Sequence, residues 1–181
     1  MSMPAGTHKL GPDHGTIAVR TSRTGAAAKA GHDLLLHVTA WSATVEVGEG
    51  STPTSLVLDA DARSLRVREG TGGLQALDDD DKENIEQTID DEVLKRHGIV
   101  FRSTSVRSAG EGGRLSVEGE LTLIGNARPI AFELMVDRDG KLSGNAVVKQ
   151  SDWGIKPYSA LFGALKVADE VEVIFDARLP D

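Results

Sequence analysis

Histidine is the side chain that titrates nearest neutral pH, so the five histidines are the first candidates for acid–base chemistry or metal binding. They are His8, His14, His32, His37 and His97. None of them forms the His-x-His or His-Glu-x-x-His spacing that places two metal ligands on one face, so we expect no metal site and no cofactor. We interpret His14 and His32 as polar groups that hydrogen-bond strand ends or turns. The alternative is that one of them acts as a general base on a hydrophobic substrate.

Other catalytic arrangements have little support in the sequence. The chain has no cysteine, which excludes a thiol nucleophile and thiolate metal ligands. No serine lies in a Gly-x-Ser-x-Gly elbow, and the glycine-rich stretch 70–73 lacks the lysine of a phosphate-binding loop. We therefore expect a binding protein rather than an enzyme.

Composition and charge limit the classes of partner that we expect the protein to bind. The formal net charge is −8, from 20 Lys and Arg against 28 Asp and Glu, which opposes binding to nucleic acid. No stretch approaches the roughly 20 apolar residues of a membrane-spanning helix. Residues 1–11 lack the apolar run of a secretory signal, so we expect a disordered lead-in and a cytoplasmic protein, with one domain over 12–181. A homodimer is left open.

The elements that must position any site are mostly strands. Apolar and polar residues alternate with period two between clusters of glycine, proline and aspartate, which is typical of strands with one buried face. The pattern predicts eight strands, at about 16–24, 34–47, 55–60, 99–108, 114–124, 129–137, 142–150 and 170–178. Their short connections favour an antiparallel, all-β barrel or sandwich.

One segment departs from this period. Ile85, Ile89 and Val93 are spaced by four residues among charged neighbours, which predicts an amphipathic helix over about 78–97. A single helix with a narrow apolar stripe covers an open end or a seam of a barrel. Whether it acts as a lid or as a fixed plug stays open.

The interior of the barrel is predicted to hold a ligand. Aromatic residues make up only 4% of the chain and the strands are rich in small side chains, which favours a cavity over a filled core. The segment 150–165 holds three of the seven aromatics, and its length favours a mouth or a lid. These aromatics either pack the core or contact ligand. From the alternation we expect the following residues to line the cavity and bind ligand: Leu34, Leu36, Val38, Phe101, Phe132, Trp153 and Phe162.

The chain resembles the YceI-like polyisoprenoid-binding proteins over about residues 13–177. The matching motifs, in order, are Asp13-His14, Gly31-His32, Ala60-Asp61-Ala62-Arg63-Ser64-Leu65, Ile99-Val100-Phe101-Arg102-Ser103-Thr104, residues 117–125 (VEGELTLIG), Arg128-Pro129-Ile130-Ala131-Phe132, Ser151-Asp152-Trp153-Gly154-Ile155 and Asp169-Glu170-Val171. The resemblance implies an extended lipocalin-like, eight-stranded barrel with the one helix inserted.

It also implies a function. A long isoprenoid lipid, such as a polyprenyl chain or an isoprenoid quinone, or another long apolar molecule, would lie in the barrel for carriage or storage. Two alternatives remain, the enzyme with His14 or His32 as general base and a structural or stress-related barrel without a ligand.

Overall fold

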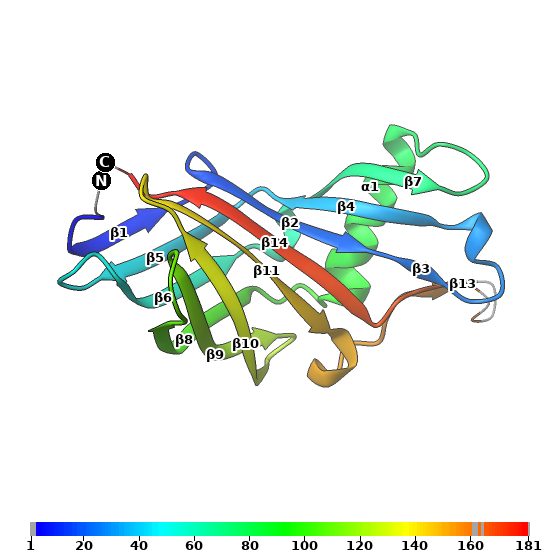
Figure 1. The fold of residues 1–181 in the computed structure, drawn as a ribbon. Helices are drawn as coiled ribbons and strands as arrows, with labels where there is room; N and C mark the ends of the chain where they lie inside the picture. The colour runs from blue at the N-terminus through cyan, green and yellow to red at the C-terminus, as the bar shows by residue number, and fades with distance from the viewer. Residues whose placement is uncertain (1–2, 161–162, 164, 181) are drawn as a thin grey trace.

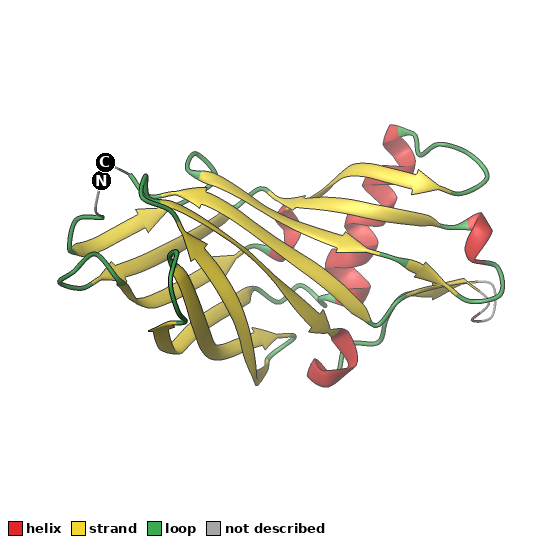
Figure 2. Cartoon of the chain, viewed as in Figure 1, coloured by secondary structure: helices red, strands yellow, loops and turns green. Residues whose placement is uncertain are grey.

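The computed structural model describes residues 3–160, 163 and 165–180, and it is dominated by one antiparallel sheet (Figures 1 and 2). The sheet has eleven strands in the order β1-β5-β6-β8-β9-β10-β11-β14-β2-β4-β7. The strands are β1 (Gly6–Leu10), β2 (Gly15–Thr21), β4 (His32–Val38), β5 (Trp41–Val47), β6 (Pro53–Ala60), β7 (Leu65–Gly72), β8 (Ile99–Ser108), β9 (Arg114–Leu123), β10 (Asn126–Val136), β11 (Lys141–Lys149) and β14 (Glu170–Arg178).

The prediction of eight strands is wrong in number, and three differences account for it. The long strand predicted over 34–47 is two strands, β4 and β5. Buried residues fall on Leu36 and Val38 before the break but on Trp41 and Ala43 after it, so the alternation changes parity and the chain must turn between them. Strand β7 lies between the strand predicted over 55–60 and the predicted helix, where no strand was expected.

The third difference is at the N-terminus. Residues 6–10, expected to be part of a disordered lead-in, form β1 and pair antiparallel with β5, from Gly6 opposite Val47 to Leu10 opposite Ala43. Leu10 is 3% exposed and Met3 is also buried, so this segment contributes to the core. The alternation over five residues is too short to identify a strand whose partner lies more than thirty residues along the chain.

The sheet is rolled, because its second and its tenth strands are joined by a link of two residues. Thr39 and Ala40 alone connect β4 to β5. The backbone N–H of Thr39 donates to the carbonyl of Ser64, and the Ala40 carbonyl accepts from the N–H of Asp61, both at 3.0 Å. The two ends of the sheet therefore meet at this point, and the fold is a curled, lipocalin-like half-barrel.

Short elements complete the structure. The 3-10 turns are η1 (Ala28–Ala30), η2 (Ala62–Ser64) and η4 (Gln150–Trp153), and a small sheet in the order β12-β13-β3 joins β12 (Ser159–Ala160), β13 (Leu165–Val167) and β3 (Arg23–Thr24). The segment predicted as a mouth over 150–165 thus contains η4 and part of this small sheet.

The helix lies between β7 and β8 in the chain. It comprises α1 (Asp79–Thr88) and a π-helical turn, η3 (Ile89–Val93), which is shorter than the range 78–97 predicted for one helix. Asp78 and Asp81 cap its N-terminus reciprocally. The wider turn ends in a Leu94 N–H to Ile89 carbonyl bond of 2.8 Å, and Lys95 and Arg96 then take positive φ, so the helix cannot continue to residue 97.

The helix covers the free edge of β7. The Val67 N–H donates to the Glu86 carboxylate at 2.9 Å, so a helix side chain satisfies a strand group that lacks a neighbouring strand. In Figure 1 both termini lie at the left end of the molecule and α1 lies toward the opposite end. Among the described residues, no helix has the length and apolar character needed to cross a membrane.

Candidate functional site

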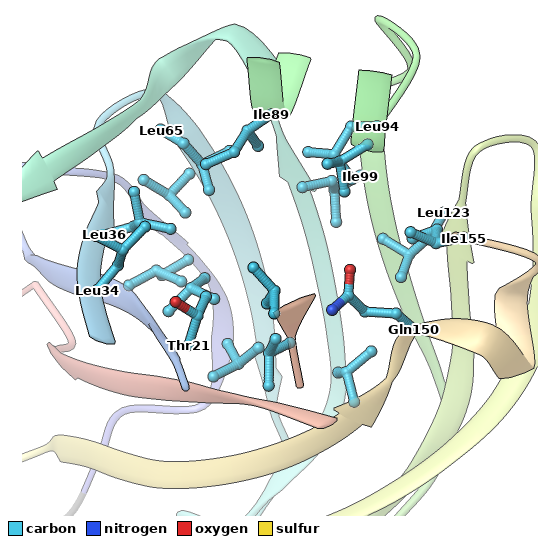
Figure 3. Close-up of a pocket in the computed structure, with 18 of the residues that line it drawn as sticks. Thr21, Leu34, Leu36, Leu65, Ile89, Leu94, Ile99, Leu123, Gln150 and Ile155 are labelled. Atoms are coloured by element: carbon cyan, nitrogen blue, oxygen red, sulfur yellow. The ribbon is translucent and has the colours of Figure 1, made fainter. Parts of the chain in front are cut away.

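The rolled sheet and the helix enclose a cavity of about 590 Å³. Pockets that hold drug-sized ligands span about 300–1,000 Å³, so this one has room for a substantial molecule. Its wall is formed by inward side chains from most strands of the main sheet and from the helix (Figure 3). The apolar wall residues include Ile17, Val19, Leu34, Leu36, Val38, Leu56, Leu58, Leu65, Ile85, Ile89, Val93, Leu94, Ile99, Phe101, Leu121, Leu123, Ile130, Phe132, Leu134, Val148, Ile155, Val171, Val173 and Phe175.

The cavity occupies only part of the interior. Toward the chain termini the space inside the sheet is filled by buried side chains that do not line the cavity, among them Leu10, Val45, Val117 and Leu142. Trp41 and Phe175 meet edge to face near this boundary, with ring centroids 6.0 Å apart. The open volume therefore lies at the helix end of the molecule.

A pair of aromatic rings forms one wall. Phe101 on β8 and Phe132 on β10 have ring centroids 5.3 Å apart, although β9 separates their strands. Gly119 on β9 makes this possible, because a Cβ at that position would lie 2.6 Å from the Phe101 ring and 2.4 Å from the Arg102 carbonyl. The absent side chain lets the Phe101 ring lie across the middle strand.

The helix forms the opposite part of the wall. Ile85 of α1 and Ile89 of η3 line the cavity, and Figure 3 shows Ile89 beside Leu65 of β7. The apolar stripe that predicts the helix from sequence is thus the face that completes the cavity. The sequence does not show that this stripe meets β7, since the contact depends on the rolling of the sheet.

Five of the residues predicted to line the cavity do line it: Leu34, Leu36, Val38, Phe101 and Phe132. Their contact with a ligand stays a prediction. Phe162 lies outside the described residues. Trp153 is 4% exposed but is not part of the cavity wall.

Trp153 instead anchors the turn that follows β11. Its indole Nε1–H donates to the Leu121 carbonyl of β9 at 2.7 Å, and its own carbonyl accepts from Asn126 Nδ2 at 2.7 Å. Of the two roles left open for this aromatic, the structure shows packing. The alternation of β11 ends at η4, so the side chain at 153 cannot be placed by extending the strand pattern.

Two buried polar wall residues, Thr21 and Gln150, are not among the residues predicted to bind ligand. Gln150 is held by two bonds, from its backbone N–H to the Asp169 carbonyl at 2.8 Å and from its Nε2 to the Ala168 carbonyl at 3.2 Å. The Asp169 carboxylate accepts from both the hydroxyl and the N–H of Ser151, and these hydrogen bonds lower the pKa of Asp169 from its usual value. The alternation could have found both wall residues, since Thr21 is in phase with Ile17 and Val19, and Gln150 with Val148.

The histidines do not gather at the cavity. His14 lies in the turn before β2, where its Nδ1 accepts from the Gly11 N–H at 3.1 Å, and it is not a wall residue. His32 lines the cavity, and its Nε2 lies 2.7 Å from the Gln75 carbonyl. Within the described part of the chain, no group of three or more His, Asp or Glu side chains is placed to hold a metal ion.

Comparison with known proteins identifies the family. The family profile of the YceI-like domain matches residues 9–179, nearly the whole chain. The chain belongs to the YceI-like family. No curated protein sequence matches it significantly.

Solved structures share the YceI-like fold at low sequence identity. BcnA of Burkholderia cenocepacia is 18% identical with a TM-score of 0.65, over 90% of this chain and 94% of that one. The YceI protein of Campylobacter jejuni is 13% identical with a TM-score of 0.60, over 81% and 84%. A polyisoprenoid binding domain from Saccharophagus degradans, implicated in plant cell wall breakdown, is 8% identical with a TM-score of 0.57, over 98% and 100%. At these identities the likeness concerns the fold.

Proposed function

We propose that this YceI-like protein binds one long apolar lipid of the isoprenoid class inside the rolled sheet, as a carrier or a store. The observation that carries the proposal is the apolar cavity of about 590 Å³ between the sheet and the helix. Membership of the YceI-like family supports it, as does the similar fold of a domain described as polyisoprenoid-binding.

The physical basis is burial of apolar surface. Each 100 Å² of ligand surface removed from water contributes about 2.5 kcal/mol, from which the cost of immobilising the ligand must be subtracted. An extended hydrocarbon chain exposes a large apolar area per polar group, so it gains most from a long wall of leucine, isoleucine, valine and phenylalanine. A compact polar metabolite gains little there.

The two alternatives fit the structure less well. A barrel that only scaffolds its loops predicts an interior filled by side chains, which the cavity does not match. An enzyme with a histidine base needs an imidazole poised in the cavity. His14 is not in the wall, and the Nε2 of His32 lies against the backbone carbonyl of Gln75.

A pair of substitutions on β14 tests the proposal. Val173 faces the cavity and Ile174 does not, since neighbouring residues of a strand point to opposite faces. Val173→Phe fills part of the cavity, and Ile174→Phe adds the same ring to the other face. The lipid bound to each purified protein is measured by native mass spectrometry and, after solvent extraction, by chromatography.

We expect an isoprenoid adduct on the wild-type protein and on Ile174→Phe, and at least a tenfold lower occupancy on Val173→Phe. A wild-type protein that stays at its apo mass and also fails to bind added geranylgeraniol would overturn the proposal. Equal occupancy in the two variants would show that lipid binds elsewhere.

A further inference from the structure

The cavity contains two deeply buried polar side chains that the binding of a plain hydrocarbon does not use. Three polar side chains are buried among the described residues, Thr21, Ser64 and Gln150. The Ser64 hydroxyl donates to the carbonyl of Asp61 and does not line the cavity. Thr21 is 9% exposed and Gln150 is 7% exposed, and both are wall residues. Figure 3 shows the Thr21 hydroxyl and the Gln150 amide projecting into the cavity from different parts of the wall.

The orientation of the Gln150 amide is determined by its surroundings. Its Nε2 donates to the Ala168 carbonyl at 3.2 Å, and a carbonyl accepts only from the nitrogen end of an amide. Oε1 is therefore the end left for the cavity, and the hydrogen bonds of the described residues include none to it. The side-chain hydrogen bonds of the described residues include none to Thr21 Oγ1 either, and Thr21 is also a wall residue. When a ligand covers these two groups, a head group that supplies hydrogen-bond partners gains affinity over one that does not.

The strand register places the two groups two residue positions apart along the cavity. Thr21 is the last residue of β2 and Gln150 directly follows β11, with β14 between these strands. Arg20 on β2 pairs with Glu172 on β14, so Thr21 comes beside Val171, which pairs with Val148, and Gln150 lies two residues beyond Val148. All four side chains, of Thr21, Val148, Gln150 and Val171, face the cavity. The head group of a lipid seated here would have polar contacts on two sides and apolar contacts elsewhere.

Three charged side chains, those of Arg23, Asp81 and Lys166, also line the cavity. The Arg23 guanidinium donates through Nη1 to the carbonyls of Gly31 and Thr71, at 3.0 and 2.9 Å. The end of the Lys166 side chain lies beside Gly163, where a Cβ would be 4.0 Å from Nζ. Neither cation hydrogen-bonds Gln150 or Thr21. An anionic head group held by Gln150 and Thr21 alone would be a buried charge without a counter-charge.

We propose that Gln150 and Thr21 select a lipid with an uncharged head group that carries a hydrogen-bond donor, such as the hydroxyl of a prenyl alcohol, over one that ends in a phosphate. Gln150 Oε1 accepts from the ligand hydroxyl, and the Thr21 hydroxyl supplies the second polar contact of the head group. The inference rests on the proposed function, because it concerns the polar end of the lipid that the cavity holds.

Three probes with the same C20 tail test the inference: geranylgeraniol, geranylgeranyl methyl ether and geranylgeranyl diphosphate. The ether keeps the oxygen acceptor and loses the donor. Each probe is titrated against a fluorescent fatty-acid analogue bound to the delipidated protein. We expect the alcohol to bind about 3- to 10-fold more tightly than the ether, which corresponds to one hydrogen bond, and at least 10-fold more tightly than the diphosphate.

Two variants assign the effect to the two residues, and both keep size and remove the polar group. Gln150→Leu should bring the affinity for the alcohol close to that for the ether, while the affinity for the ether stays within twofold. Thr21→Val removes a donor to the ligand oxygen, which the alcohol and the ether share, so it should weaken both by about 3- to 10-fold. Thr16→Val is the control, since Thr16 is an exposed residue of the same strand and does not line the cavity. Gln150→Leu also loses the bond to Ala168, so thermal midpoints are recorded, and Thr21→Val tests the inference if Gln150→Leu does not fold.

The outcomes separate the two proposals. If none of the three probes binds the wild-type protein, the proposed function fails. If the ether binds as tightly as the alcohol, or if the diphosphate binds most tightly, the head-group inference fails while the proposed function stands. A preference for the alcohol that Gln150→Leu retains, or an affinity for the alcohol that Thr21→Val leaves unchanged, would also overturn the assignment to Gln150 and Thr21.

Discussion

Replacing Trp153 by phenylalanine should lower the stability of the fold and leave ligand binding unchanged. The indole is 4% exposed, lies outside the cavity wall and donates its Nε1–H to the Leu121 carbonyl at 2.7 Å. Phenylalanine keeps a ring in the same place but cannot donate. The substitution therefore removes a bond between the turn after β11 and strand β9 without touching the cavity.

The expected magnitude has two parts. A lost buried hydrogen bond costs about 0.5–1.5 kcal/mol. The smaller ring also lacks three heavy atoms of the indole, and at about 0.8 kcal/mol for each buried carbon this adds about 2 kcal/mol. The sum is about 3 kcal/mol. For a chain of this length, 1 kcal/mol shifts the melting temperature by about 2–4 °C, so we expect a decrease of about 6–12 °C.

Phe132→Leu is the matched variant on the cavity wall. It also removes three heavy atoms from a ring, but this ring faces the cavity and pairs with Phe101. We expect its ligand affinity to fall by about 1 kcal/mol, or roughly fivefold, because part of the apolar contact is lost. The dissociation constant for geranylgeraniol is measured for both variants at 20 °C, and unfolding is followed by calorimetry.

Two results would refute this reasoning. If Trp153→Phe is still folded at 20 °C and loses as much affinity as Phe132→Leu, then Trp153 contacts the ligand and belongs to the cavity wall. If its melting temperature equals that of the wild type, then the bond to Leu121 does not contribute to stability as calculated.

Further predictions concern the helix and the turn beside Gln150. Glu86→Ala should lower the free energy of unfolding by about 1.5–3 kcal/mol in urea titrations, because the Val67 N–H at the free edge of β7 loses its charged acceptor. Hydrogen bonds from Ser151 lower the pKa of Asp169, so the unfolded chain binds this proton more readily than the folded protein. Stability from Asp169 is thus fully present above about pH 4 and is lost as the pH falls through the lowered pKa, and Asp169→Asn should flatten the acid side of a plot of melting temperature against pH.

Each of these predictions has a control. Glu83→Ala changes an exposed glutamate one turn earlier in α1, and it should leave the unfolding free energy within about 0.5 kcal/mol of the wild type. A loss as large as that of Glu86→Ala would assign the effect to helix propensity or net charge. For Asp169, an unchanged slope below pH 4 in the asparagine variant would show that other carboxylates control acid unfolding.

The sequence correctly predicts the features of the fold that depend on the spacing of residues within one strand or helix. Leu34, Leu36 and Val38 alternate on one strand, so their common face follows from the geometry of an extended chain, and all three line the cavity. The stripe of Ile85 and Ile89 predicts both the helix and its apolar face. The change of buried parity between Val38 and Trp41 was also present in the sequence and indicates the break that divides β4 from β5.

Pairing between distant segments could not be read in this way. Strand β1 is stabilised by pairing with β5, and a backbone N–H at the free edge of β7 is hydrogen-bonded by Glu86 of the helix. These partners lie in other parts of the chain, so the local sequence of neither strand was enough to predict it. The rolling of the sheet follows from the link of two residues between strands that stand second and tenth in the order. The strand order, and with it the rolling of the sheet, can be assigned only when all the strand pairings are known.

The sequence alone therefore determined an antiparallel β protein with one amphipathic helix, an acidic surface and a set of apolar wall residues, because each of these depends on composition or on spacing within one element. Tertiary structure decided what the wall encloses and which polar groups reach it. Trp153 lies outside the cavity because the chain turns after β11, and its bond to Leu121 orients the indole. Gln150 continues the alternation of Ala146 and Val148 into the cavity, and its bond to Ala168 orients the amide. Side-chain direction in such a turn depends on partners from other strands, which spacing along the chain does not encode.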